Sequence, residues 1–358
     1  MIIKLKHIAN LSGATVKEFE GEKKYYSTGN IKTENFELVT FKNRPSRANL
    51  LVNENDILIA KMKNTNKTTI ATKEMEEFIF STGFSILSSK NINTKYLYYL
   101  LESPEFIEKK DVLSVGTTQV SINDETLKNI EINYINDTNI QCKIATFLDR
   151  KVAEIDNIIE KTKVTIQDYK KYKQSMITEA ITKGLNNNVE IKDSNNKWIR
   201  NIPITWNIQK LKTFIEIPVI DGPHESPELF EEGVPYISAT AIENGKINFD
   251  LKRGYISEEY CNQCDIRYKP EINDILVIKL GATTGQVAMV DTDKRFNIWV
   301  PLAAVRCNLS VDPRFIYYSF QSSSTIRQME LMWTFGTQQT LGVKTIEQLM
   351  FSLPSKSE

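Results

Sequence analysis

The sequence predicts an α+β protein in which two repeated mixed α/β domains are joined by one long, coiled-coil-forming α-helix. Three observations support this prediction. The stretch from Thr138 to Gly184 carries a helical apolar repeat that no proline interrupts. The segments on either side share an ordered series of short motifs. In both segments, short β-rich runs come before helical runs, which favours a mixed domain rather than a purely helical one.

The central stretch has a seam position at alternating steps of four and three residues. The seam consists of Leu148, Val152, Ile155, Ile159, Thr162, Ile166, Tyr169, Lys173, Met176 and Ala180. This spacing is the heptad pattern of a coiled coil, and only Thr162 and Lys173 interrupt its apolar character. Thr138 and Gln141 are expected to form a capping box, and Gly184 suits the left-handed position after the last turn. Residues 137–184 are thus predicted to form a single helix, roughly 65–70 Å long.

A seam of this length needs a second helix to cover it. One interpretation is a structural antiparallel hairpin or a simple spacer, and the other is a ruler that sets the distance between two modules. The related segments on either side favour the ruler. We expect partner binding by the apolar seam residues Leu148, Val152, Ile155, Ile159, Ile166, Tyr169 and Met176.

The two flanking segments are predicted to be copies of one domain, because their matching motifs keep the same order. The first match is Lys4-Leu5-Lys6 with Lys210-Leu211-Lys212. The later matches are Lys24–Ser27 with Pro235–Ser238, Asn55–Lys61 with Asn273–Lys279, Tyr98-Tyr99 with Tyr317-Tyr318, and Gly116–Gln119 with Gly336–Gln339. We expect the copies to span residues 1–136 and 210–353. Residues 185–209 would form an anchored linker, and residues 354–358 a stub.

Each copy is predicted to contain the same elements in the same order. In the first copy these are strands over 56–61 and 78–87, helices over 94–101 and 104–113, and a closing strand over 130–134. In the second copy they are strands over 274–279 and 286–290, helices over 313–320 and 324–333, and a closing strand over 349–353. The matched Gly-Thr turns come just before the closing strands.

Composition excludes several classes of protein. The 358 residues are 41% hydrophobic and 25% charged, with a formal net charge of zero, which is typical of a soluble globular protein without a broadly basic surface. No run is long and apolar enough to span a membrane, and no signal peptide is recognisable. Four cysteines suit a reducing cytoplasm. Cys261 and Cys264 have zinc-like spacing, but no second pair follows, so we expect no metal site.

The common catalytic motifs are missing from the sequence. It has no phosphate-binding loop with lysine, no dinucleotide-binding glycine pattern, no nucleophile elbow and no zinc-protease motif. The Asp/Asn-Pro-Pro-aromatic run of amino-methyltransferases is also missing. Gly281–Gly285 lacks the lysine of a phosphate-binding loop and is interpreted as a turn between strands. Glu108-Lys109-Lys110 has the local form of a nuclease motif but falls in a helical stretch. We therefore expect a chain without catalytic residues or cofactors.

A further series of motifs lies around and beyond the long helix. Ile144–Asp149 opens the helix and Thr182–Leu185 closes it, followed by Lys192–Ser194, Trp198-Ile199, Ile202-Pro203 and Trp206. This series resembles the central conserved region of the specificity subunits of Type I restriction-modification enzymes. Both repeats also resemble the target recognition domains of that family. The motifs concerned are Asp221–Pro227, Gly233–Ile237, Gly281–Gly285 and Gly336–Gln339.

The resemblance implies a non-catalytic subunit that binds double-stranded DNA. Each target recognition domain would read one half of a bipartite, asymmetric site. The conserved helices would dock two adenine methyltransferase subunits, and restriction subunits would join that complex. The family also has a second long helix after the second domain, where this sequence stops. We therefore expect self-association through the central helix, or a helix borrowed from another chain. The alternative function is a coiled-coil scaffold with duplicated adaptor domains.

Residues that read bases are usually Arg, Lys, Asn, Gln, Ser and Thr on loops. Candidates in the first domain are Lys61, Lys63, Asn64 and Lys67, with Arg44 and Arg47 suited to phosphates. Candidates in the second domain are Lys279, Thr283, Thr284, Gln286, His224 and Ser226. The matched turns add Thr117, Thr118, Gln119, Thr337, Gln338 and Gln339. For each residue, the alternative is a solvated loop position or a hydrogen bond that forms a turn.

Overall fold

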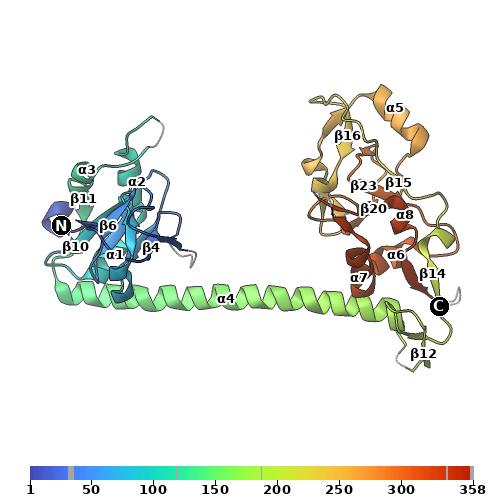
Figure 1. Cartoon of the computed structure of the whole chain (residues 1–358), viewed down its shortest axis with the longest axis horizontal. Coiled ribbons are helices and arrows are strands. Elements are labelled where there is room, and N and C mark those ends of the chain that lie inside the picture. The colour runs from blue at the N-terminus through green and yellow to red at the C-terminus, as the bar shows by residue number, and fades with distance from the viewer. Residues whose placement is uncertain (31–35, 118–119, 187, 336–337, 355–358) are drawn as a thin grey trace. The chain divides into compact units, whose positions relative to one another are not determined.

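The computed structural model describes residues 1–30, 36–117, 120–186, 188–335 and 338–354. The chain divides into two compact units, Met1–Lys161 and Thr162–Glu358. Each unit combines strands with helices, as Figure 1 shows, and the predicted fold class is confirmed. No described helix is long and apolar enough to cross a membrane.

The first unit is built from two small sheets with helices beside them. Its strands are β1 (Ile2–Lys4), β2 (Ala9–Leu11), β3 (Ala14–Thr15), β4 (Lys23–Tyr26), β5 (Glu37–Val39), β6 (Ala48–Leu51), β7 (Ile57–Ala60), β8 (Thr68–Ile70), β9 (Ile79–Ser81), β10 (Phe84–Ser89) and β11 (Glu131–Asn133). Its helices are α1 (Thr94–Leu101), α2 (Pro104–Val112), α3 (Asp124–Lys128) and the start of α4 (Thr138–Lys183). The sheets have the orders β2-β10-β7-β8 and β3-β6-β9-β4-β5, and β1 pairs with β11.

The second unit contains the end of α4 and the remaining elements. Its strands are β12 (Ile191–Asp193), β13 (Asn201–Pro203), β14 (Asn207–Lys210), β15 (Ile220–Asp221), β16 (Val234–Ile237), β17 (Ile242–Glu243), β18 (Lys246–Ile247), β19 (Gly254–Ile256), β20 (Ile275–Ile278), β21 (Val287–Met289), β22 (Asn297–Ile298), β23 (Leu302–Val305), β24 (Thr334–Phe335), β25 (Gln339–Thr340) and β26 (Met350–Leu353). Its helices are α5 (Glu258–Arg267), α6 (Pro313–Phe320), α7 (Ser323–Met332) and α8 (Val343–Ile346).

The repeat seen in the sequence is also a repeat of structure. The sheet β15-β23-β20-β21 has the same order as β2-β10-β7-β8, and β14 pairs with β26 as β1 pairs with β11. In both units one pair of strands is parallel, β4 with β9 and β16 with β22. The matching residues Asn55 and Asn273 both adopt left-handed backbone angles, with φ of 69° and 74°. The two copies therefore share their turns as well as their strands.

The central strands β7 and β20 explain how each unit buries its core. All four residues of each strand are buried, because both faces of the sheet are covered. In β20, Ile275 and Val277 join one apolar cluster, whereas Leu276 and Ile278 join another on the opposite face. Residues of β7 divide between two clusters in the same alternating way.

Predicted and observed elements agree closely at the helices. The bounds of α1 and α6 are those predicted, α2 ends one residue earlier than predicted, and α7 begins and ends one residue earlier than predicted. The β-rich run predicted over 78–87 forms two strands, β9 and β10. A turn separates them, in which the Gly83 amide donates to Ser81 Oγ at 3.1 Å. This turn sends β9 and β10 into different sheets.

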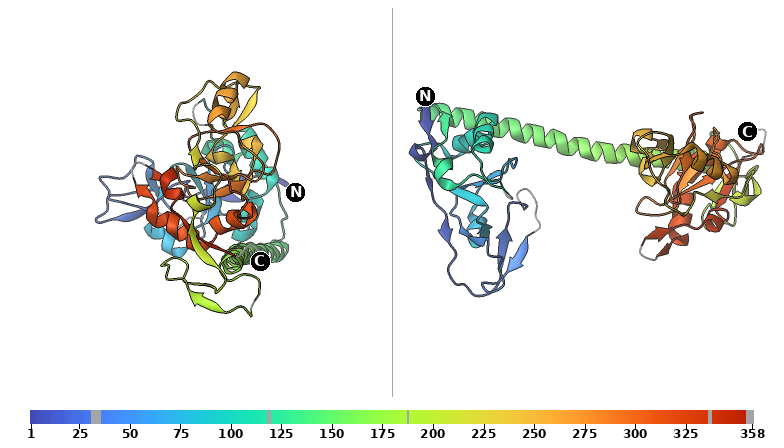
Figure 2. Two further views of the ribbon diagram at one scale, coloured as in Figure 1. Left: turned by 90° about the vertical axis from the view of Figure 1, so that its right-hand side faces the viewer. Right: turned by 90° about the horizontal axis from the view of Figure 1, so that it is seen from above.

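The predicted capping box at the start of α4 is wrong. The Asp137 carboxylate accepts hydrogen bonds from the amides of Asn139 and Ile140, at 2.8 and 3.2 Å, and so caps the helix. Gln141 is fully buried and bonds instead to the Ile135 carbonyl and the Asn93 amide. At the other end, Gly184 has the expected positive φ, 76°. Figure 2 shows α4 as one continuous coil.

Near each end of α4 a few residues are buried against the adjoining unit, whereas the middle of the helix is exposed. Near the start, Ala145 lies in the core of the first unit, and Tyr99 Oη donates to Asp149 Oδ1 at 2.8 Å. Near the end, Ile181 is buried, and its carbonyl accepts from Ser352 Oγ at 2.7 Å. Between these ends, apolar seam residues face solvent, with Ile155 at 55% and Ile159 at 46% exposure. The seam thus has no covering helix among the described residues.

Candidate nucleic-acid interface

In the first unit, the chain leaving β7 pairs with the segment around the Gly-Thr turn. Met62 and Ser121 form a β-bridge, as do Val115 and Ser121. The Lys63 amide also donates to the Val120 carbonyl at 2.9 Å. These contacts place the predicted residues 61–64 beside the segment 120–122 at one corner of the unit, which we call the first polar corner (residues 61–64, 115–117 and 120–122). Thr118 and Gln119 lie outside the described residues.

The second unit repeats this arrangement after β20. Leu280 and Thr340 form a β-bridge, and the Gly281 amide donates to the Gln339 carbonyl at 3.1 Å. The Leu341 amide donates to the Lys279 carbonyl at 2.8 Å, as the Ile122 amide does to that of Lys61. We call residues 279–286 and 338–341 the second polar corner. Thr337 lies outside the described residues.

The matching lysines Lys61 and Lys279 each form an ion pair inside their own unit. Lys61 Nζ lies 3.0 Å from Asp124 Oδ2, and Asp124 also accepts from Ser85 Oγ at 2.6 Å. Lys279 Nζ lies 2.9 Å from Asp221 Oδ2, and both side chains are only 10% exposed. Because these ammonium groups already have carboxylate partners, they have less freedom to contact a ligand than the sequence suggested.

The Asp221 carboxylate accepts hydrogen bonds from two further side chains, Arg267 and His224. Its Oδ1 lies 2.7 Å from Arg267 Nη2, at the end of α5, and its Oδ2 lies 3.1 Å from His224 Nε2. Burial of Asp221 would raise the pKa of its carboxyl group. The hydrogen bond and charge of Lys279, together with His224 and Arg267, outweigh that effect and lower the pKa. Asp221 is thus an ionised carboxylate at neutral pH.

The loop 221–227 that carries His224 and Ser226 is held closely against the sheet. A Cβ added at Gly222 would lie 2.3 Å from the Ile298 carbonyl oxygen, so only glycine fits there. Further along, the Trp299 indole N–H donates to the Glu225 carbonyl at 3.1 Å, and Tyr260 Oη donates to Glu225 Oε1 at 2.9 Å. His224 and Ser226 themselves remain exposed. The loop therefore presents polar side chains from a fixed backbone.

Other candidates in the first unit differ in what they contact. Arg44 donates to the carbonyls of Phe41 and Ala48, and its guanidinium lies 4.0 Å from the centre of the Phe41 ring. Arg44 therefore shapes its own loop. Lys67 Nζ donates to the Thr28 carbonyl at 2.9 Å. Arg47, Lys63 and Asn64 are exposed at the surface.

The glycine-rich run Gly281–Gly285 is a turn between strands, as predicted. It joins β20 and β21, which pair antiparallel, and both glycines have positive φ. Thr284 is buried and donates to the Gly281 carbonyl at 2.7 Å, so its hydroxyl closes the turn. Thr283 and Gln286 are exposed, as is Gln338, whereas Gln339 is half-buried. These exposed side chains are the ones at the second polar corner that can meet a ligand.

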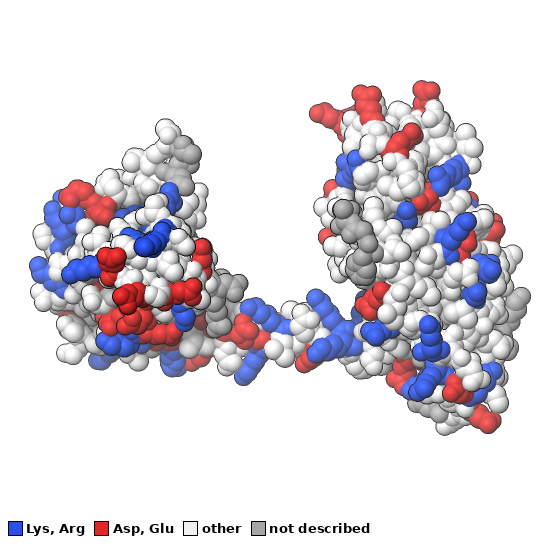
Figure 3. Space-filling model, in the orientation of Figure 1, with Lys and Arg blue, Asp and Glu red and all other residues white. Residues whose placement is uncertain are grey.

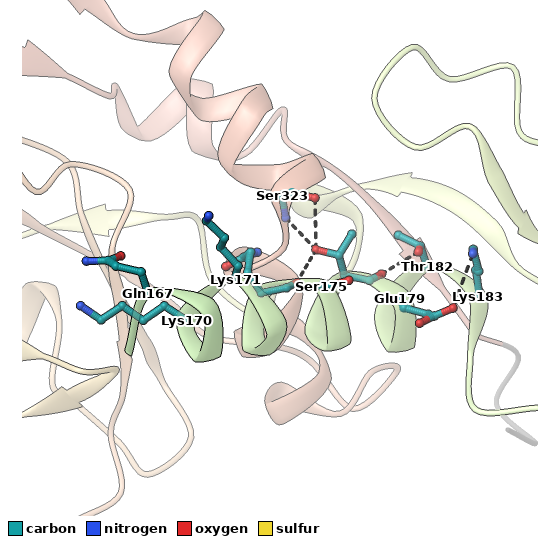
Figure 4. A pocket seen from close by; sticks show the side chains of 10 residues that line it. Gln167, Lys170, Lys171, Ser175, Glu179, Thr182, Lys183 and Ser323 are labelled. Carbon is teal, nitrogen blue, oxygen red and sulfur yellow. Dashed lines mark hydrogen bonds and ion pairs between the residues drawn. The ribbon is translucent and has the colours of Figure 1, made fainter. Parts of the chain in front are cut away.

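Sequence reasoning missed a lysine-bearing groove on the second half of α4. The groove has a volume of about 700 Å³ and is lined by Lys170, Lys171, Lys183 and Ser323, among others. Figure 4 shows how α4 meets α7 at this place, where Thr178 Oγ1 accepts from the Ser323 amide at 3.0 Å. The closely spaced lysines were the available signal, because such groups suit phosphates. Figure 3 shows charges of both signs interspersed over the visible surface.

No group of three or more potential metal ligands is found within the described ranges. Cys261 and Cys264 both lie buried on α5 as free thiols. Burial raises the pKa of the Cys261 thiol to about 11, so it is protonated at neutral pH. These two cysteines are packed residues of the second unit.

Comparison with known proteins gives consistent matches. Residues 2–168 match the family model of the Type I restriction modification DNA specificity domain. The Type I restriction enzyme MjaVIII specificity subunit of Methanocaldococcus jannaschii is 27% identical over 254 residues. That alignment covers 69% of this chain and 54% of the relative, so the chain spans about half the length of the curated relative it matches.

Two solved structures have the same fold. One comes from work on complex assembly and conformational transition of the type I R-M system. It matches with a TM-score of 0.68 and 16% identity, over 100% of this chain and 86% of that one. The other is the HsdS subunit from Thermoanaerobacter tengcongensis, with a TM-score of 0.53 and 15% identity, over 99% and 85%. At these identities the likeness concerns the fold.

Proposed function

We propose that the chain is a specificity subunit of the Type I restriction-modification family and that it reads the DNA target of such a complex, because residues 2–168 match the DNA specificity domain of that family. Each unit reads one half of a bipartite, asymmetric site. The chain contributes no catalytic group. Adenine methyltransferase subunits transfer the methyl group, and restriction subunits join the same assembly.

The observation that carries this proposal is the repetition of one fold unit within a chain that matches a DNA specificity domain. Duplicated readers suit a site with two specified halves, because each copy can meet its own stretch of duplex. The two polar corners share their backbone pairing but differ in most exposed side chains. Such differences allow the two half-sites to have different sequences, since base edges are read by side chains.

The exposed seam of α4 supports docking of another protein. Ile155, Ile159 and Ile166 are about half exposed, which is unusual for large aliphatic side chains that recur at heptad spacing. A helix from a methyltransferase subunit, or from a second copy of this chain, would bury them. We propose that the seam residues of α4 form this interface, which the isoleucine variants described in the Discussion test.

The experiment is co-expression of this chain with the adenine methyltransferase subunit of its own system, followed by long-read mapping of methylated adenines. We expect one split motif with two specified blocks around a fixed gap. A palindromic motif would indicate that one unit is used twice in a dimer. Binding of the purified complex to a duplex carrying the motif should weaken steeply with salt, because phosphate contacts release counterions. A stable complex that neither methylates nor binds DNA would favour the scaffold instead.

A further inference from the structure

The second unit contains one carboxylate that connects its buried lysine to two exposed polar groups. Asp221 bonds to Lys279 on the inside and to Arg267 and His224 toward the surface. The exposures differ accordingly. The side chain of Lys279 is 10% exposed, whereas those of Arg267 and His224 are 54% and 70% exposed. The carboxylate thus lies between the core and the surface.

We propose that Asp221 is a positioning residue for DNA reading, which holds Arg267 and His224 in the orientation that contacts bases of one half-site. This inference rests on the proposed function and names the residues that carry it out in the second unit. Arg267 was not among the candidates found from sequence. Lys279, which was, becomes the buried counter-ion of Asp221.

The geometry gives the two surface groups complementary hydrogen-bonding roles. A carboxylate only accepts, so His224 Nε2 must donate to Asp221 Oδ2, which leaves Nδ1 as an acceptor when the ring is neutral. Arg267 bonds to Asp221 through Nη2, so its other N–H groups remain as donors. One donor group and one acceptor at a fixed place can read the edge of a base pair in the major groove.

The group formed by Asp221, Arg267 and His224 is held rigidly, as side chains that recognise bases must be. Asp221 ends β15, and the next residue, Gly222, lies against the backbone of Ile298 and Trp299. Arg267 ends α5, whose carboxyl-terminal position is fixed by the buried Cys261 and Cys264. A side chain held by a second bond loses less freedom when it binds than a free one does.

The first unit provides a matched comparison. Lys61 occupies the position of Lys279 and pairs with Asp124. Asp124, however, accepts its other hydrogen bond from Ser85, a buried side chain, and not from exposed basic groups. The Lys61–Asp124 pair therefore holds α3 against the sheet without orienting a side chain toward a ligand. Asp124→Asn is the control variant for Asp221→Asn.

The test maps the methylation motif of the co-expressed complex for Asp221→Asn, His224→Ala and Arg267→Ala. We expect each variant to lose about 10-fold discrimination at the same base positions of one half-site, the effect of losing one good base contact. The other half-site should keep its wild-type specificity. Asp124→Asn should leave the half-site affected by Asp221→Asn unchanged.

A double variant separates positioning from charge balance. Asp221→Asn alone leaves Lys279 as an uncompensated buried charge, so the second unit could lose stability. Asp221→Asn with Lys279→Gln removes both charges, and tryptophan fluorescence checks that the unit remains folded. If Asp221 positions Arg267 and His224, the double variant remains relaxed at that half-site.

Two outcomes would overturn the inference. One is wild-type specificity in the double variant, which would make Asp221 only the counter-ion of Lys279. The other is unchanged motifs in both His224→Ala and Arg267→Ala, whose exposed side chains can be removed without affecting folding. Failure of the proposed function is a separate result, because the wild-type complex itself would then give no bipartite motif.

Discussion

Replacing Asp274 by alanine is expected to destabilise the second unit strongly. Asp274 is 1% exposed and accepts hydrogen bonds from Tyr268 Oη at 2.7 Å and from the Glu271 amide at 2.9 Å. It also accepts two from Arg306, both at 2.8 Å. The alanine variant would leave the guanidinium, whose side chain is 15% exposed, without its main partner.

The loss of unfolding free energy depends on the hydrogen-bond partners that Arg306 retains in the alanine variant. Breaking a buried ion pair by removing one partner costs about 3–5 kcal/mol. Arg306 retains the Glu271 carboxylate and the Lys269 carbonyl, both at 2.8 Å, so we expect a loss near the lower figure. For a unit of this size, about 3 kcal/mol lowers the urea midpoint of unfolding by roughly 1 M.

Tryptophan fluorescence is the assay, because all four tryptophans belong to the second unit and report its unfolding. The matched control is Asp56→Ala in the first unit, at the equivalent position of the repeated Asn-Asp-Ile-Leu motif. Asp56 accepts from Ser12 Oγ and the Asn53 amide, which are neutral donors. The Asp56→Ala substitution should lower the free energy of unfolding of the first unit by about 1–3 kcal/mol. The unfolding transition of the second unit, which tryptophan fluorescence reports, should keep its wild-type midpoint. A midpoint shift below roughly 0.3 M for Asp274→Ala would refute the reasoning.

Three further predictions concern the seam, the second polar corner and pH. Replacing Ile155 and Ile159 by aspartate should abolish partner docking on α4 with both units folded, as size-exclusion chromatography and circular dichroism would show; an intact complex would remove these residues from the interface. Gln286→Ala should relax specificity at one half-site in methylation mapping, whereas uniform loss over all sequences would indicate a phosphate contact. Asp221 has a lowered pKa in the folded state, so its stabilising contribution is present above about pH 4 and is lost as pH falls through the folded pKa. Acid unfolding followed by tryptophan fluorescence should therefore be less steep for Asp221→Asn with Lys279→Gln than for wild type.

The sequence was sufficient for those features that depend on local pattern. Heptad spacing predicted α4, and the helices predicted over 94–101 and 313–320 have the observed bounds of α1 and α6. The repeated Asn-Asp-Ile-Leu motif predicted that β7 and β20 are equivalent. Their identical places in two sheets of the same order confirm this. These features depend on residues that are close together in the sequence, so the sequence alone can predict them.

The features that the sequence did not reveal depend on partners distant along the chain. Lys61 and Asp124 are separated by 63 positions, so nothing local indicates that the lysine is paired. Gln141 looked like a capping residue, but tertiary contacts with Asn93 and Ile135 use its amide instead. Arg267 was missed because α5 resembles an ordinary surface helix until Asp221 is found beside its end.

The lysines that follow the central strands, Lys61 after β7 and Lys279 after β20, have a consequence for the evolution of such chains. Lys61 finds its acid within the first unit and Lys279 within the second, so neither pair borrows a charge from the other copy. A recombination event that exchanges one unit for a homologue would carry the lysine and its acid together. The buried lysine of the exchanged unit would therefore keep its carboxylate partner. Exchange of a unit could change the target preference without a compensating mutation elsewhere in the chain.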